Sequence, residues 1–92
     1  MTQQINKVRV VAFQDSEMWI AQCVEFDICV QGNDLGQAQR RMLVALSQEA
    51  KYTQEKCGEA FKGIDPAPDF YDAMYQSAEA SLSSDMDFRI AA

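Results

Sequence analysis

The chain has 92 residues, 48% of them hydrophobic, and carries a formal net charge of -6 with a sequence pI of about 4.4. This length has room for one small domain, so we expect residues 1–92 to form a single unit whose modest core would benefit from oligomerisation. An acidic surface repels phosphate groups, which argues against direct binding of nucleic acid and favours a basic protein partner.

The sequence also bears on the cellular compartment. No apolar run approaches the roughly 20 residues that span a membrane, and residues 1–6 are too polar for a secretory signal. Cys23, Cys29 and Cys57 are odd in number and lie in unrelated settings, which suits a reducing cytoplasm better than a disulfide framework. We therefore expect a cytoplasmic protein.

The first third of the chain predicts an antiparallel meander of three short strands. These strands are expected over residues 5–13, 18–25 and 28–31. They carry apolar residues on both faces, because Val10 and Ala12 point to one side of the first strand while Val11 points to the other. Each face therefore needs a cover, or an apolar surface would invite aggregation.

The hydrophobic period changes from two to about 3.6 after a Gly-Asn-Asp segment. Asp34 is a good N-cap, and Gln37 three residues later can complete a capping box. The apolar stripe that follows predicts a helix over residues 35–57, with Gly58 as its C-terminal stop. The length of this helix leaves a break near Tyr52 open.

Two prolines, Pro66 and Pro68, forbid a continuous helix beyond this point. We expect a second helix over residues 69–80, a loop over 81–85, and a short final strand over 86–90 beside the first. The predicted fold is α+β, with a three-stranded antiparallel meander plus a C-terminal fourth strand, a long helix and a shorter one, in the order β-β-β-α-α-β.

Several short motifs together resemble a known family. They are the aromatic Trp19 on the second strand, Cys29, Gly32 before the helix, Ala38 within it, and the Ile-Asp-Pro-Ala-Pro connector at 64–68. On these motifs, most of residues 7–90 resemble the N-terminal domain of HicB-type antitoxins. The resemblance implies a partial RNase H-like fold and a module that docks on, and blocks, a small basic toxin ribonuclease.

The chain departs from the family's pattern in the turn between the second and third strands. The usual proline and glycine are replaced by acidic residues and by Ile28, and Gly36 stands where an acidic helix former is usual. Many members also carry a DNA-binding domain after the last strand, whereas this chain ends at Ala92. Operator binding and autoregulation are therefore not expected.

Catalysis is not expected either. The chain has no histidine, so neither a Ser-His nor a Cys-His pair can form. The acidic turns contain Asp15, Glu17, Glu25 and Asp27. Carboxylates of this kind could suggest a two-metal nuclease site, but a strand of about eight residues would hold the two turns roughly 25 Å apart. We expect no metal and no cofactor.

The same four carboxylates are interpreted either as solvated turn charges or as contacts for a basic partner. Trp19 and Phe26 are the candidate interface residues, and Trp19 is interpreted either as a core anchor or as an interface hot spot. The leading hypothesis is a non-enzymatic HicB-like antitoxin that occludes a small basic ribonuclease toxin, as a homodimer formed through a strand edge or an open sheet face. The alternative is a phage or mobile-element inhibitor, anti-CRISPR-like, whose acidic surface blocks a nucleic-acid-binding complex.

Overall fold

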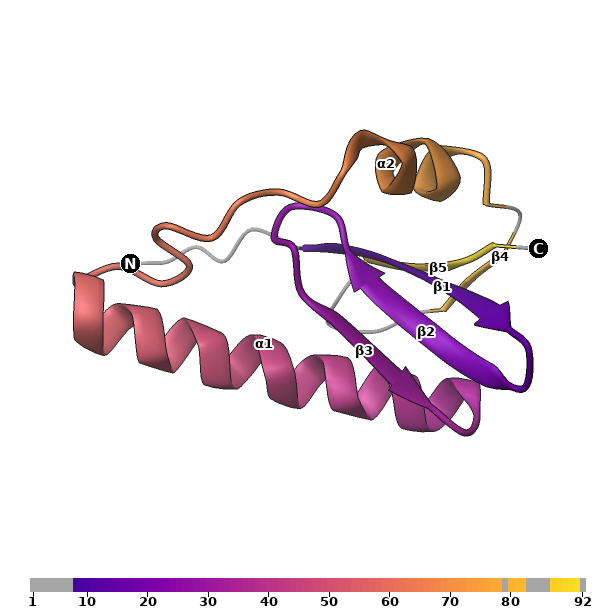
Figure 1. The fold of residues 1–92 in the computed structure, drawn as a ribbon, viewed down its shortest axis with the longest axis horizontal. Coiled ribbons are helices and arrows are strands. Elements are labelled where there is room, and N and C mark those ends of the chain that lie inside the picture. The colour runs from indigo at the N-terminus through magenta and orange to yellow at the C-terminus, as the bar shows by residue number, and fades with distance from the viewer. Residues whose placement is uncertain (1–7, 79, 83–86, 92) are drawn as a thin grey trace.

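The computed structural model describes residues 8–78, 80–82 and 87–91. They form an α+β fold in which a mixed sheet has a long helix on one face and a short helix on the other (Figure 1). The strands are β1 (Arg9–Asp15), β2 (Met18–Cys23), β3 (Cys29–Gly32), β4 (Ala80–Leu82) and β5 (Asp87–Ile90), and the helices are α1 (Leu35–Cys57) and α2 (Asp69–Gln76). The predicted α+β class is confirmed.

The sheet has the strand order β3-β2-β1-β5-β4. Antiparallel pairing of β1 with β2 and of β2 with β3 confirms the predicted meander. The final strand, β5, lies beside β1 as expected and runs parallel to it, with Val10 opposite Phe88. The chain reaches this position through both helices, because a parallel neighbour needs a long crossover connection.

The structure corrects the prediction near the C-terminus. The loop expected over residues 81–85 was wrong in its first part, because Ala80–Leu82 forms β4 and pairs antiparallel with β5. A three-residue strand is too short to show a period of two. The second helix ends at Gln76 rather than near residue 80. Just after this end, the Ser77 hydroxyl donates to the Met74 carbonyl at 3.3 Å. Residues 5–7 and 86 of the expected strands lie outside the described residues.

The first hairpin has a shorter turn than the gap between the first two predicted strands. β1 continues to Asp15, which pairs with Met18, so the turn consists of two residues. Ser16 in this turn has a φ of 58°, in the left-handed region that two-residue hairpin turns require. Residues 14–17 lie between the first two predicted strands, and only Ser16 and Glu17 of these form the turn.

Helix α1 has the predicted boundaries. The Gln37 amide donates to Asp34 Oδ1 at 2.7 Å, and Gln37 Oε1 accepts from the Asn33 amide at 2.7 Å. The second contact closes the capping box on the residue before the cap. At the other end, Gly58 has a φ of 80° and its amide donates to the Gln54 carbonyl at 3.0 Å. The helix is continuous, without a break near Tyr52.

The larger apolar cluster lies between the sheet and α1. Its buried members are Val10, Ala12, Ala21, Cys23, Ala38, Met42, Leu46 and Phe88. Burial raises the pKa of the Cys23 thiol, as expected for a thiol that serves as a small core residue. The prediction that alternate residues of β1 face opposite ways is confirmed, because Val11 lies in the cluster on the α2 side.

Helix α2 covers the opposite face through a smaller cluster centred on Tyr75. This side chain is only 2% exposed and packs with Val11 and Val24. The guanidinium groups of Arg9 and Arg89 lie 5.4 Å and 4.2 Å from the centroid of its ring. Cation–π contacts therefore supplement a modest apolar area in holding α2 to the sheet.

The pH dependence of stability provides a test of how α2 is attached. Burial, together with the Asp87 carboxylate, raises the pKa of the Tyr75 hydroxyl. The stability that this raised pKa contributes is fully present below the unfolded-state pKa of about 10. It is lost as the pH rises through the higher pKa of the folded state. We expect Tyr75→Phe to lose less stability between pH 8 and 11 than the wild type in urea titrations. Tyr52→Phe, at a position 57% exposed, is the control and should follow the wild-type curve.

Gly32 permits the close approach of β3 to the start of α1. A Cβ atom at this position would lie 2.7 Å from the Ala38 backbone nitrogen, so the backbone would have to shift. We expect Gly32→Ala to lower the free energy of unfolding by about 1–3 kcal/mol in urea titrations. Gly36→Ala is the matched control: its Cβ would meet only side-chain ends, at 3.3 Å or more, and it should gain about 0.5–1 kcal/mol. Equal effects would contradict this account.

Candidate partner-binding surface

The four predicted partner-binding carboxylates do not form one site. Asp15 and Glu17 lie at the tip of the β1–β2 hairpin, whereas Glu25 and Asp27 lie in the turn between β2 and β3 (Figure 1). The six residues of β2 separate the two turns by roughly 20 Å. Asp15 and Glu17 are exposed, and the carboxylates of the other turn make contacts within the protein.

Glu25 joins the turn to the sheet. Its Oε1 accepts from the Arg9 backbone amide at 2.7 Å, and its Oε2 accepts from the Arg9 guanidinium. The same guanidinium reaches Asp72 of α2 at 2.9 Å. Hydrogen bonding to Glu25 raises the pKa of Arg9 further. Glu25 therefore helps to hold β1, the turn and α2 together.

Asp27 stabilises the same turn through its contact with a buried glutamine. Gln22 is 2% exposed, and its Nε2 donates to Asp27 Oδ1 at 3.1 Å and to the Cys23 carbonyl at 3.0 Å. The Asp27 amide donates to the Asp65 carbonyl at 2.7 Å, which fixes the proline-containing connector to the turn. These contacts supply a backbone solution for a turn without the proline and glycine that the HicB pattern would place there.

Both predicted interface aromatics pack within the fold. Trp19 is partly buried against the core cluster on the α1 side. Phe26 stacks on Phe61 with the ring centroids 4.2 Å apart and an interplanar angle of 12°. Phe61 adopts a φ of 66°, which is uncommon for a bulky residue, and its amide donates to Thr53 Oγ1 at 2.6 Å. These contacts give both aromatic side chains a structural role.

An acidic surface surrounds the N-terminal end of α2, next to the β2–β3 turn. We define the acidic α2 surface as Asp27, Asp65, Asp69, Phe70 and Asp72, all of which are exposed. Phe70 is 55% exposed, and its ring centroid lies 3.9 Å from that of Tyr71. Burial raises the pKa of Tyr71, and the nearby Cys29 and Asp27 raise it further.

The sequence contains a signal for this surface that no short motif marks. The twelve residues 65–76 include three aspartates and no lysine or arginine. Phe70 and Met74 recur at helical spacing, a pattern that favours packing of Phe70 against the fold. In the structure, Tyr75 is the buried residue of α2 and Phe70 faces solvent. An exposed aromatic side chain with acidic neighbours is typical of an interface anchor with a charged rim.

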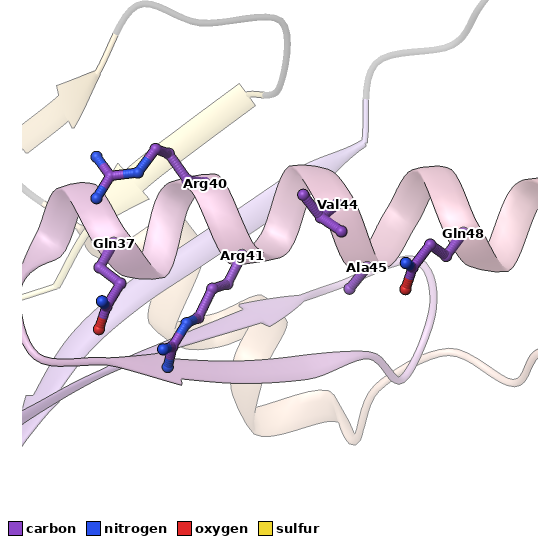
Figure 2. A pocket seen from close by; sticks show the side chains of 6 residues that line it. All are labelled: Gln37, Arg40, Arg41, Val44, Ala45 and Gln48. Atoms are coloured by element: carbon purple, nitrogen blue, oxygen red, sulfur yellow. The ribbon is translucent and has the colours of Figure 1, made fainter.

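Helix α1 has the opposite electrostatic character. It carries four of the eight basic residues of the chain, Arg40, Arg41, Lys51 and Lys56, and two glutamates. A shallow hollow of about 380 Å³ on this helix is lined by Gln37, Arg40, Arg41, Val44, Ala45 and Gln48 (Figure 2). Because α1 and α2 lie on opposite faces of the sheet, the basic and acidic surfaces point in different directions (Figure 1).

The described residues contain no cluster of three or more His, Cys, Asp or Glu side chains placed to hold a metal ion. Among the described helices, none combines the length and apolar character needed to cross a bilayer. Comparisons with known proteins found no matching family model, no matching curated protein and no matching solved structure.

Substitution of the turn glutamates tests the structural role of Glu25. Glu25→Ala removes the acceptor of the Arg9 amide and one of the two acceptors of its guanidinium, so we expect the free energy of unfolding to fall by about 1–3 kcal/mol. The exposed Glu17→Ala in the other turn should change it by less than about 0.5 kcal/mol. Urea unfolding at pH 7 measures both, and a Glu25→Ala value as small as that of Glu17→Ala would refute the role.

Proposed function

We propose that this protein is a non-enzymatic, HicB-like antitoxin that binds a small basic ribonuclease toxin and occludes its active surface. The observation that carries the proposal is the acidic α2 surface, which combines four exposed aspartates with the exposed ring of Phe70. Carboxylates on this surface complement a basic partner, and an exposed aromatic ring supplies apolar contact that charge alone does not. We place this activity in the cytoplasm.

The arrangement of the elements supports the scaffold part of the proposal. An antiparallel β1-β2-β3 meander is followed by α1, and the chain then returns to place β5 parallel beside β1. This is the order of elements expected from the resemblance to the partial RNase H-like domain, with β4 as an addition. The Pro66–Pro68 connector lies between the two helices, as the family pattern has it.

Electrostatics determine how the partner would approach. Arg9 offsets part of the charge of Glu25 and Asp72, whereas Asp65 and Asp69 enter neither of the two ion pairs found among the described residues. Their field would accelerate association with a cationic surface and weaken as salt is added, because exposed charges are screened over about 8–10 Å at physiological ionic strength. The complex should therefore form fastest at low salt.

We also infer a homodimer formed through a sheet edge. The two helices cover opposite faces of the sheet, which favours an edge over an open face as the contact between copies. A dimer of this kind would leave the acidic α2 surface of each copy accessible to its own partner.

A second candidate function uses the same surface against a different target. The concentration of aspartates at residues 65–72, without a basic residue, also fits an inhibitor that competes with nucleic acid for the basic surface of a defence complex. A toxin gene beside the gene for this chain would favour the antitoxin, and a phage setting without one would favour this alternative.

Co-expression tests the leading proposal. The protein is produced with the small basic ribonuclease toxin encoded nearest to it, and growth and RNA cleavage are measured. We expect neutralisation and a complex that weakens between 50 and 300 mM salt. If no ribonuclease toxin is neutralised by a folded, well-expressed protein, the proposal is wrong.

Two surface variants then locate the interface. We expect Phe70→Ala to weaken toxin binding by about 2 kcal/mol, roughly thirtyfold, because it removes the aromatic anchor. Asp65→Lys should also weaken binding, whereas Glu17→Lys changes the net charge by the same amount at the far hairpin and should have little effect. Calorimetric titration measures all three. An effect of Glu17→Lys as large as that of Asp65→Lys would move the interface to the hairpin.

A further inference from the structure

The outer edge of β3 is a place where another strand can add. β3 is the terminal strand of the sheet and pairs with β2 alone among the described residues. The Ile28 carbonyl accepts from the Cys23 amide at 2.9 Å, so this residue is directed toward β2. In an antiparallel ladder the direction alternates, which turns the backbone groups of Cys29 and Gln31 outward.

Arg41 identifies the direction of this edge independently. Its guanidinium donates to the Gln31 carbonyl at 2.8 Å, from a side chain that is exposed on α1. The same guanidinium lines the hollow on α1, so the hollow borders the β3 edge (Figure 2). An arginine has five N–H donors, and a single hydrogen bond to Gln31 leaves capacity for a carboxylate.

The lining of the hollow indicates what it can bind. It has two guanidinium groups, from Arg40 and Arg41, two amide side chains and the small apolar side chains of Val44 and Ala45, with no acidic residue. Val44 is 55% exposed. Guanidinium groups recognise carboxylates, and Val44 and Ala45 can contact the methylene groups of acidic side chains that point to the same face of an added strand.

We propose that the β3 edge and the neighbouring hollow on α1 bind an extended acidic peptide as an added strand. The backbone groups of Cys29 and the amide of Gln31 would pair with the peptide main chain, and Arg41 would bind a carboxylate beside the Gln31 carbonyl that it already contacts. Arg40 lies across the hollow from Arg41 and adds positive charge there (Figure 2). This site lies on the other side of the sheet from the acidic α2 surface and goes beyond the proposed function. It can exist whether or not the protein neutralises a toxin.

Two other occupants fit the same surface less well. A nucleic acid would find two arginines, and its phosphates could accept from the outward amides, but a phosphate has no donor for the outward carbonyl of Cys29, which a peptide main chain supplies. A second copy paired through the β3 edge by a two-fold axis would bring two sets of Arg40 and Arg41 to one seam, where like charges repel, so the inferred homodimer would use the other edge of the sheet, at β4. A short acidic polypeptide satisfies both the charge and the edge.

Fluorescence anisotropy with a defined probe tests the proposal. The probe is a fluorescein-labelled peptide of eight residues that alternates glutamate and valine, titrated with the full chain at low salt. We expect saturable binding with a Kd of about 0.1 mM or tighter. The same peptide with lysine in place of glutamate, or with alternate amides N-methylated, should bind at least tenfold more weakly. Equal binding of the three peptides would overturn the proposal.

Matched variants separate the edge from the charge. Cys29→Pro removes the outward amide without removing a bond to β2, whereas Cys29→Ala keeps the amide. Arg41→Glu reverses a charge in the hollow, and Lys51→Glu makes the same change on α1 outside it. We expect at least tenfold weaker binding for Cys29→Pro and Arg41→Glu and less than a twofold change for the two controls. If only the two controls lose binding, or if none of the four variants does, the peptide does not bind at this site.

Three further measurements keep the result decisive. Circular dichroism establishes which variants fold, and if Cys29→Pro does not, the N-methylated peptide tests the edge in its place. A 20-nucleotide oligothymidylate that binds more tightly than the glutamate peptide would overturn the proposal in favour of nucleic acid. Sedimentation that shows a dimer, lost in Arg41→Glu without any peptide present, would overturn it in favour of a second copy.

Discussion

The fold depends on one strand that is apolar on both faces. β1 lies at the centre of the sheet between β2 and β5, and its consecutive residues Val10, Val11 and Ala12 are all fully buried. Alternate side chains point in opposite directions, so neither face can be left to water. The need to cover both faces places α1 on one side and α2 on the other, and therefore produces two separate exposed surfaces.

The two covers are attached by different physical means. α1 contributes Ala38, Met42 and Leu46 to a continuous apolar cluster, and its capping contacts fix where it begins and ends. α2 is short and depends on Tyr75, on cation–π contacts and on the ion pairs of Arg9. Arg9 contacts the β2–β3 turn and α2 at the same time, so the acidic turn serves the attachment of the helix.

The sequence predicted those parts of the fold that local chemistry determines. The change of period, the Asp34 cap and Gly58 gave the boundaries of α1 because each depends on neighbouring residues only. It could not give β4, whose three residues become a strand through pairing with β5. It also could not assign Glu25 and Asp27, because their partners Arg9 and Gln22 become neighbours only when the sheet forms. The exposed position of Phe70 likewise follows from which face of α2 meets the sheet.

The separation of charge gives the two surfaces different ligands. The basic residues of α1 and the aspartates of residues 65–72 would attract opposite ligands, and the sheet between them holds the two regions apart. A basic partner on the acidic α2 surface would reduce the net negative charge that opposes an acidic peptide on the other side. Binding at one surface should then favour binding at the other through the long-range field. Added salt should weaken this coupling, because it shortens the Debye length over which the charges interact.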